Sequence, residues 1–203
     1  MRRLLVSFCM LLMGVLVGCS PAQSWTVEEM PHAPDTVAAF FEYLQTGEYE
    51  AAQAMLAEES ALVLSEMELV YKDAIFRNLT LVEILEHGEL GWVDDDTNEM
   101  HQSANVTLSV NAVDFAAVMD AVMMEAFLWA FGDITVRELT DRIGELLVEK
   151  MNDNDAPMIS ETLVVELIPD DGEWRIVADE AFADAVTGGL LSFAEYADGW
   201  LDS

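Results

Sequence analysis

Cysteine is almost absent from this chain of 203 residues, in which the only two are Cys9 and Cys19. Both lie at the N-terminus, so the rest of the chain has no disulfide of its own and no thiolate ligand for a metal. A domain without such cross-links is stabilised by burial of apolar side chains, and 53% of the residues are hydrophobic. The length is sufficient for one well-buried core, or at most for two small ones.

Basic residues are also scarce, eight against 39 acidic ones, which gives a formal net charge of −31. The affinity of proteins for nucleic acids and for anionic lipid headgroups rests on lysine and arginine, so neither is expected as a partner. The acidic residues are spread along the chain rather than collected in a tail. This distribution favours a role in solubility, with attraction of cations or of basic partners as the alternative.

Sequence signatures of catalysis are missing as well. The chain has no G-x-S-x-G nucleophile motif, and the pair Gly188–Gly189 stands without the lysine of a phosphate-binding loop. Carboxylates are so numerous that two of them close in sequence carry no information about general acid–base chemistry. The sequence therefore predicts no catalytic residue and no cofactor.

Metal ligands occur without the spacing that metal sites require. His87 and His101 flank the acidic run 94–99, and the two would meet if this segment formed a hairpin. Neither H-x-H nor H-x-x-x-H is present, so solvated loop residues are the simpler interpretation. The acidic runs 94–99 and 152–156 lack the glycine and the terminal glutamate of a calcium-binding loop. No metal site is predicted, and weak calcium binding stays open.

The N-terminus, MRRLLVSFCMLLMGVLVGCS, has the pattern of a secretory signal, with two arginines before an apolar run. The run is shorter than the roughly 20 residues of a helix that crosses a bilayer. Its end, LVGC, resembles the bacterial lipobox, in which a small residue precedes an invariant cysteine. By that resemblance Cys19 receives diacylglycerol and becomes the new N-terminus. The alternative is an ordinary signal peptide with a cysteine near its end.

Cleavage before Cys19 would divide the chain into a signal peptide (1–18), a tether (19–34) and a single domain (35–203). The tether contains three prolines and no helical period. Removal of the signal leaves six basic residues and a net charge of −33. Two or more acyl chains hold a protein stably at a bilayer, so we expect a membrane-anchored protein on the extracytoplasmic side.

The hydropathy of residues 35–203 alternates between helical and extended periods, which predicts an α+β domain with an antiparallel sheet. The expected helix N-caps are Asp35, Ser65 and Thr135, the last two as capping boxes with a glutamate three residues on. The expected strands lie at 79–85 and 104–113 and in a hairpin over 158–178, and 87–101 is expected to be a connection or an irregular strand pair. The expected helices lie at 36–46, 48–59, from 65, at 114–131, at 135–147 and at 179–190.

The run SVNAVDFAAVMDAVMMEAFLWAF (109–131) is the most apolar part of this region. Asp120 and Glu125 near its middle argue against a membrane span, because each costs about 2.5–3.5 kcal/mol at a bilayer centre. A helix that is apolar nearly all round needs cover on most of its surface. We therefore expect a helical hairpin docked on the domain. Phe115, Val118, Met119, Val122 and Phe127 would face the sheet, and Met123, Met124 and Leu128 would face the next helix.

The alternative for this run is an adaptable groove for a small apolar ligand or a protein partner, since methionines and aromatic residues also mark such surfaces. The residues that would line the groove are Phe115, Met119, Met123, Phe127 and Trp129.

Three segments resemble the nuclear transport factor 2-like (cystatin-like) superfamily, namely TVAAFFEYLQTGEYEAAQAML, ANVTLSVNAVDFAAVM and ETLVVELIPDDGEWRIVADEAFADAVTGGL. The first is similar to the opening helical pair of that fold. The other two are similar to the later strands and C-terminal end of uncharacterised bacterial lipoproteins of the superfamily. The resemblance implies a cone-like, curved antiparallel sheet around packed helices. The chain departs from that pattern by the two helices expected over 114–151, which are inserted between strands and would be able to plug the cone.

Enzymes of this superfamily, such as ketosteroid isomerase and scytalone dehydratase, carry acid–base residues inside the cone. None of their motifs matches positions of this chain. The sequence therefore favours a non-enzymatic binding or accessory module, with a lyase or isomerase of a small extracellular molecule as the alternative. A catalytic cone would require a histidine, aspartate or tyrosine deep in a pocket.

Overall fold

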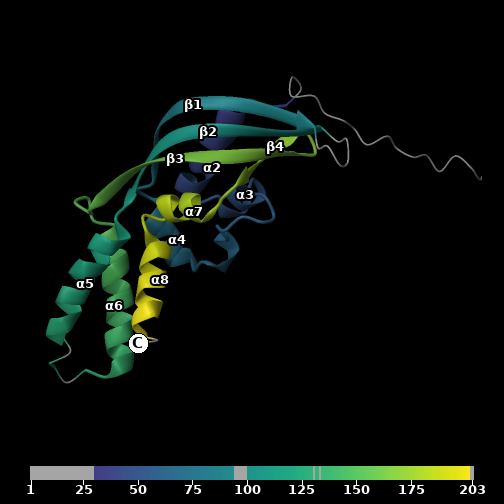
Figure 1. The fold of residues 1–203 in the computed structure, drawn as a ribbon. Helices are drawn as coiled ribbons and strands as arrows, with labels where there is room; N and C mark the ends of the chain where they lie inside the picture. Colours follow the sequence, from purple (N-terminus) through teal and green to yellow (C-terminus); the bar gives the residue numbers. More distant parts are fainter. Residues whose placement is uncertain (1–29, 94–99, 130, 133, 202–203) are drawn as a thin grey trace, which may run out of the picture.

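The computed structural model describes residues 30–93, 100–129, 131–132 and 134–201. Helices and strands are mixed, and the chain has the predicted α+β class (Figure 1). The elements follow one another as α2 (Ala33–Thr46), α3 (Tyr49–Ala54), the 3-10 turn η2 (Leu64–Glu66), α4 (Leu69–Phe76), β1 (Thr80–Val93), β2 (Met100–Val113), α5 (Phe115–Trp129), α6 (Val136–Met151), β3 (Met158–Asp170), β4 (Glu173–Val177), α7 (Glu180–Val186) and α8 (Leu190–Leu201).

The four strands form one antiparallel sheet in the order β1-β2-β3-β4, so each strand pairs with its neighbour in sequence. The β1–β2 pairing runs from Thr80 opposite Asn111 to Val93 opposite Met100, with two register shifts in β1. Such irregularities bend a strand and increase its twist. β1 to β3 arch over α2 and α7, which cover one face of the sheet (Figure 1).

Apolar side chains fill the space between the sheet and these helices. From α2 come Phe40 and Phe41, which contact the ring of Phe182 on α7 at 5.9 and 6.3 Å between centroids. Leu108 of β2 and Ile176 of β4 close the core from the sheet side, each fully buried. Every second residue of β2 points inward, as the predicted alternation of that strand requires.

Two predicted caps are wrong. α2 begins at Ala33 rather than after Asp35, because Pro34 fits the first turn of a helix, where its missing N–H is not needed. Asp35 lies in that first turn instead. α4 begins at Leu69 with Glu68 as its N-cap and no side-chain cap, so the expected capping box at Ser65 does not form.

Two other local predictions are confirmed. Thr135 accepts a hydrogen bond from the backbone of Glu138, and the Glu138 carboxylate accepts one from the Thr135 backbone, which is a complete capping box at the start of α6. The hairpin over 158–178 forms as β3 and β4, joined at Asp171 and Gly172.

The described residues of the segment 87–101 form the expected strand pair rather than a connection. Its residues 87–93 continue β1 and its residues 100–101 begin β2, so both strands are 14 residues long. Glycine and acidic residues are uncommon in strands, so the sequence left this segment ambiguous. Backbone pairing between 87–93 and 100–106 extends both strands into it.

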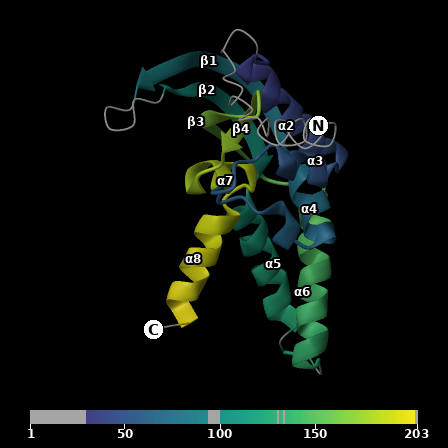
Figure 2. The same cartoon turned by 90° about the vertical axis from the view of Figure 1, so that its right-hand side faces the viewer.

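Helices α5 and α6 lie between β2 and β3, which confirms the inserted helical hairpin. The pair projects away from the sheet, so it is an arm rather than a filling of the fold (Figures 1 and 2). α8 starts beside α5, where Phe193 meets Phe115 at 5.3 Å between ring centroids, and then diverges (Figure 2). We call residues 115–151 the arm.

Candidate functional site

Few polar side chains are buried in the part of the interior that the structure describes. Among the described residues, the buried polar side chains are Thr36, Ser103 and Thr187. The Thr187 hydroxyl donates to the carbonyl of Ala183 at 2.7 Å within its own helix. No described histidine, aspartate or glutamate is buried there.

Tyr49 is the one buried tyrosine of the described residues, and it has a defined partner. Its hydroxyl donates to the Asp73 carboxylate at 2.7 Å, and the Lys72 ammonium lies 5.0 Å from its ring centroid. Burial, followed by the hydrogen bond to Asp73, raises the pKa of Tyr49 above its usual range. The hydrogen bond between Tyr49 and Asp73 joins α3 to α4. Because a phenol with a raised pKa keeps its proton, Tyr49 stabilises the fold rather than acting as a base.

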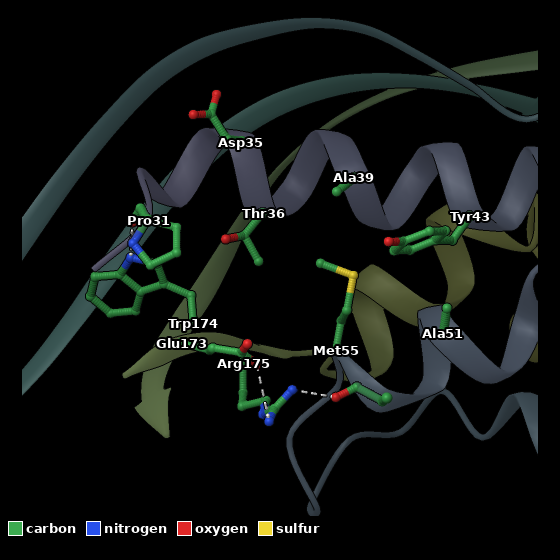
Figure 3. A pocket seen from close by; sticks show the side chains of 11 residues that line it. Pro31, Asp35, Thr36, Ala39, Tyr43, Ala51, Met55, Glu173, Trp174 and Arg175 are labelled. Atoms are coloured by element: carbon green, nitrogen blue, oxygen red, sulfur yellow. Dashed lines mark hydrogen bonds and ion pairs between the residues drawn. The ribbon is translucent and has the colours of Figure 1, made fainter. Parts of the chain in front are cut away.

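A cavity of about 460 Å³ lies between α2, α3 and β4 (Figure 3). Its walls are mostly apolar, and Met55 projects into it. Trp174 closes one end, where its indole N–H donates to the carbonyl of Pro31 at 2.8 Å. Arg175 lies at the rim, but its guanidinium already donates to Ala54 and contacts Asp170 and Glu173. The cavity therefore presents no free cation to an anionic ligand.

The histidines are not arranged as the hairpin hypothesis suggested. His87 stands opposite Val106, and His101 stands opposite Trp92, so the two do not meet across the strands. His32 approaches His87 instead, with 3.2 Å between their Nε2 atoms. No group of three or more metal-binding side chains occurs in the part of the chain that the structure describes. The acidic run 94–99 lies outside the described residues.

The proposed groove residues on α5 separate into two faces. Phe115 is buried, and Trp129 is half-buried beneath the Arg142 guanidinium, which lies 5.7 Å from the ring centroid. Met119 is half-buried at the boundary, whereas Met123 and Phe127 are exposed. The structure thus brings Met123 and Phe127 together and places Phe115 and Trp129 on the covered side.

Two expectations about this helix are wrong. Phe127 does not face the sheet, because the arm leaves the sheet before that residue, and Met123, Met124 and Leu128 are exposed rather than packed on the next helix. α6 covers only the side that carries Val122 and Ala126. One partner helix covers one face of α5, so the opposite face of an all-apolar helix stays uncovered.

The uncovered residues form a continuous apolar strip at helical spacing. Phe127 and Phe131 are in edge-to-face contact, with ring centroids 4.9 Å apart. The strip consists of Met123 (55% exposed), Met124 (75%), Phe127 (62%), Leu128 (70%) and Phe131 (76%). The last of these, Phe131, was not among the predicted site residues. Its spacing of four from Phe127 was the signal that could have included it.

A hollow of about 400 Å³ borders the strip at the tip of the arm. Leu128 belongs to both features, and the other walls come from Trp129, Gly132, Ile134, Glu138 and Arg142. The tip therefore has protruding apolar side chains beside a concave surface. Among the described residues, this combination is the strongest candidate for a binding site.

Cys19 lies outside the described residues, so its lipidation stays a prediction. No helix of the described part, α5 included, is long and apolar enough to cross a membrane. No protein-family model matches the chain, and no curated protein and no solved structure matches it.

Proposed function

We propose that the protein is a lipid-anchored extracytoplasmic module that acts by binding, and that its binding surface is the apolar strip of the arm. The occupant we propose for the strip is a second copy of the chain, so that two anchored molecules pair through their arms. The observation that carries the proposal is the exposure of five large apolar side chains in one continuous strip.

The exposed area supports a protein partner. A fully exposed phenylalanine presents on the order of 200 Å², so the five residues together present on the order of 600 Å². The largest apolar patch on a typical monomer is about 300–600 Å² and is often functional. A standard interface buries about 800 Å² on each partner. The strip with its polar rim thus has the size of a specific interface.

The charge distribution supports a second copy as that partner. The arm contains seven acidic and three basic residues, a net charge of −4, whereas the remainder after Cys19 contains 32 acidic and three basic residues. Two copies would repel each other through most of their surface. The arm is the region where this repulsion is weakest and the apolar area is greatest.

The position of the arm argues against insertion into the anchoring bilayer. The described chain starts beside the sheet, where Trp174 holds Pro31 and His32 touches His87. The arm extends from the other side of the fold (Figures 1 and 2). The chain from Cys19 to Met30 spans at most about 40 Å. An anchor at Cys19 would therefore hold the sheet end near the membrane and leave the tip pointing outward.

The shape of the tip fits pairing of identical surfaces. In a two-fold dimer the same patch is used twice, so each protruding group needs a recess on the same patch. The hollow bordered by Trp129 and Arg142 lies directly beside the protruding strip. An aromatic side chain of one copy, such as Phe131, would enter the hollow of the other.

We also propose that the fold is the cone-like fold of the nuclear transport factor 2-like superfamily. Its support is the arch of β1 to β3 over α2 and the agreement of element order with the sequence resemblance. Because apolar side chains of the sheet pack on those of α2 and α7, the function is proposed for the arm rather than for the cone.

Sedimentation equilibrium tests the pairing. The mature chain with Cys19→Ser, which cannot be lipidated, is expected to dimerise reversibly. Phe127→Ser combined with Phe131→Ser is expected to weaken the dimer at least about tenfold, because buried aromatic residues dominate interface energies. Val82→Ser combined with Leu85→Ser is the matched control, since these exposed apolar residues lie on β1. Salt is expected to strengthen the dimer, because it screens the repulsion between acidic surfaces.

A chain that remains monomeric at high concentration, or a β1 variant that is as strongly affected as the arm variant, would contradict the proposal. Co-sedimentation of the Cys19→Ser chain with neutral phosphatidylcholine vesicles, abolished by the arm substitutions, would identify lipid as the occupant instead.

A further inference from the structure

Two histidines that are far apart in the sequence meet where the chain enters the domain. His32 directly precedes α2, and His87 lies on β1. Their Nε2 atoms are 3.2 Å apart, whereas the centroids of their rings are 4.7 Å apart, with the ring planes at 77°. The two Nε2 atoms are therefore the near corners of the rings. The proposed pairing of arms makes no use of these histidines, because neither belongs to the arm.

The backbone at His32 is held on both sides. His32 is the N-cap of α2, and its carbonyl accepts hydrogen bonds from the N–H groups of Asp35 at 2.9 Å and Thr36 at 3.3 Å. The carbonyl of the preceding residue, Pro31, accepts a hydrogen bond from the indole of Trp174. These contacts fix the main chain before and after the imidazole, so the position of the ring depends on its side-chain torsions alone.

His87 comes from a strand that is paired with β2. It stands opposite Val106, and side chains of directly opposite residues lie on the same face of a sheet. Val106 is fully buried in the core between the sheet and α2. The His87 side chain therefore leaves β1 on the face that α2 covers, which brings it to the start of that helix. Both imidazoles come from positions that the fold determines, and such preorganisation lowers the cost of binding a ligand.

The separation of the Nε2 atoms suits a shared metal ion. A neutral imidazole carries a lone pair on one nitrogen, and zinc binds such a nitrogen at about 2.0–2.1 Å. With both Nε2 atoms at that distance from one zinc ion, their separation of 3.2 Å corresponds to an angle of about 100–106° at the metal. The tetrahedral angle that zinc prefers is about 109°, whereas neighbouring ligands of a square-planar copper ion are at about 90°. The spacing therefore favours zinc.

We propose that His32 and His87 bind one zinc ion through their Nε2 atoms. Both side chains are exposed, so water molecules can take the other positions of a tetrahedral site. The net negative charge of the protein attracts a divalent cation. Magnesium and calcium prefer oxygen ligands, so a pair of imidazoles selects zinc over both. The ion would tie the segment that enters the domain to β1.

Calorimetric titration of the signal-free Cys19→Ser chain with zinc chloride, after purification without a histidine tag, tests the site. With Mg²⁺ in excess to saturate weak carboxylate sites, one zinc ion is expected to bind per chain. His32→Gln and His87→Gln are each expected to lower the affinity at least about tenfold, because even the loss of an outer-shell partner costs about 10–100-fold. The variant with both substitutions is expected to resemble the single variants, since one imidazole alone cannot chelate the ion. His101→Gln, at the start of β2, is the matched control and leaves the affinity unchanged.

The stability of the chain gives a second readout. Zinc is expected to raise the midpoint of thermal unfolding of the Cys19→Ser chain and of its His101→Gln variant, because an ion that binds only the folded state stabilises it. His87→Gln is expected to remove this shift while its circular dichroism without zinc stays unchanged. The ring nitrogen signals of His32 and His87 in NMR spectra are expected to move on addition of zinc.

No zinc binding in the presence of Mg²⁺ would overturn the proposal and would leave the two rings joined by a hydrogen bond alone. Equal zinc affinities of the Cys19→Ser chain and its His87→Gln variant would overturn it as well, because the ion would then lie elsewhere. These readouts are independent of dimerisation, which the Phe127 and Phe131 substitutions report separately.

Discussion

At the scale of single residues, Gly188 lies very close to the backbone of Val113. Its φ of +68° is unfavourable for other residues, and a Cβ built on it would lie 1.8 Å from the carbonyl oxygen of Val113. Its own carbonyl accepts a hydrogen bond from the N–H of Phe115 at 2.9 Å. This glycine therefore fixes the end of α7 against the point where α5 leaves the sheet, and so positions both the arm and α8.

Gly188→Ala is expected to destabilise the fold by about 3 kcal/mol or more, because a steric clash adds to the backbone strain. Gly189→Ala is expected to cost only about 1 kcal/mol, since its φ is also positive but its Cβ would meet open space. Gly88→Ala is the control, because Gly88 has no positive φ and its Cβ would meet no atom within 4 Å. This substitution is expected to change the unfolding free energy very little. Urea unfolding measures the unfolding free energy of the three variants. Equal destabilisation by Gly188→Ala and Gly189→Ala would contradict the steric clash at Gly188.

The Tyr49–Asp73 pair predicts a pH dependence. The raised pKa of Tyr49 means that the folded chain keeps the phenol proton above pH 10, where an unfolded chain releases it. The stabilisation is thus complete below about pH 10 and is lost as pH rises toward the folded-state pKa. Tyr49→Phe is expected to cost about 1 kcal/mol at pH 7 and to flatten the fall in unfolding free energy above pH 10. An unchanged slope in this alkaline range would show that burial does not hold the proton.

At the scale of elements, local patterns predicted most helices and the hairpin, because caps and periodicity act within a few residues. The capping box at Thr135 and the β3–β4 turn are of this kind. The full length of β1 and β2 was only one of two alternatives for 87–101, since the glycines and acidic residues of that segment also fit a connection. The orientation of α5 was missed, because it depends on contacts with other elements. The sequence shows that the helix is apolar on all sides, but not how many neighbours cover it.

The start of α6 gives a test of the arm as an element. Thr135→Ala is expected to destabilise it by about 1 kcal/mol and to increase hydrogen exchange in the first turn. The backbone hydrogen bond from Thr135, followed by its hydroxyl, lowers the pKa of Glu138. The contribution of the Glu138 carboxylate to the unfolding free energy is therefore present above pH 4.5, and it is lost as the pH falls through the lowered pKa. Thr140→Ala, in the interior of the same helix, is the control, and equal exchange in the two variants would contradict the role of the cap.

At the scale of the whole molecule, the fold separates two surfaces of opposite character. The body carries most of the acidic residues, and the arm carries half of the basic residues of the mature chain together with the exposed apolar strip. This division was only partly predictable. The sequence identified the apolar run and gave Met123 and Phe127 as residues of a groove, but the exposure of the strip follows from the projection of the arm away from the sheet.

The anchor is a property of the whole molecule as well. Cys19→Ser is expected to abolish lipidation and to release the protein from the membrane fraction, because the predicted anchor depends on that sulfur. Mass spectrometry of the N-terminal peptide and fractionation of cells measure the two effects. An unchanged membrane fraction in the variant would contradict the lipid anchor.

Cross-linking tests the pairing of arms most directly. The signal-free Cys19→Ser chain contains no cysteine, so a single introduced cysteine reports its own position. With Met124→Cys, in the strip, a short thiol-specific cross-linker is expected to produce covalent dimers at micromolar concentration. With Leu85→Cys, an exposed residue of β1, the chain is expected to remain largely monomeric. Equal yields at the two positions, or no dimer at Met124→Cys, would contradict the proposal that the strip binds a second copy.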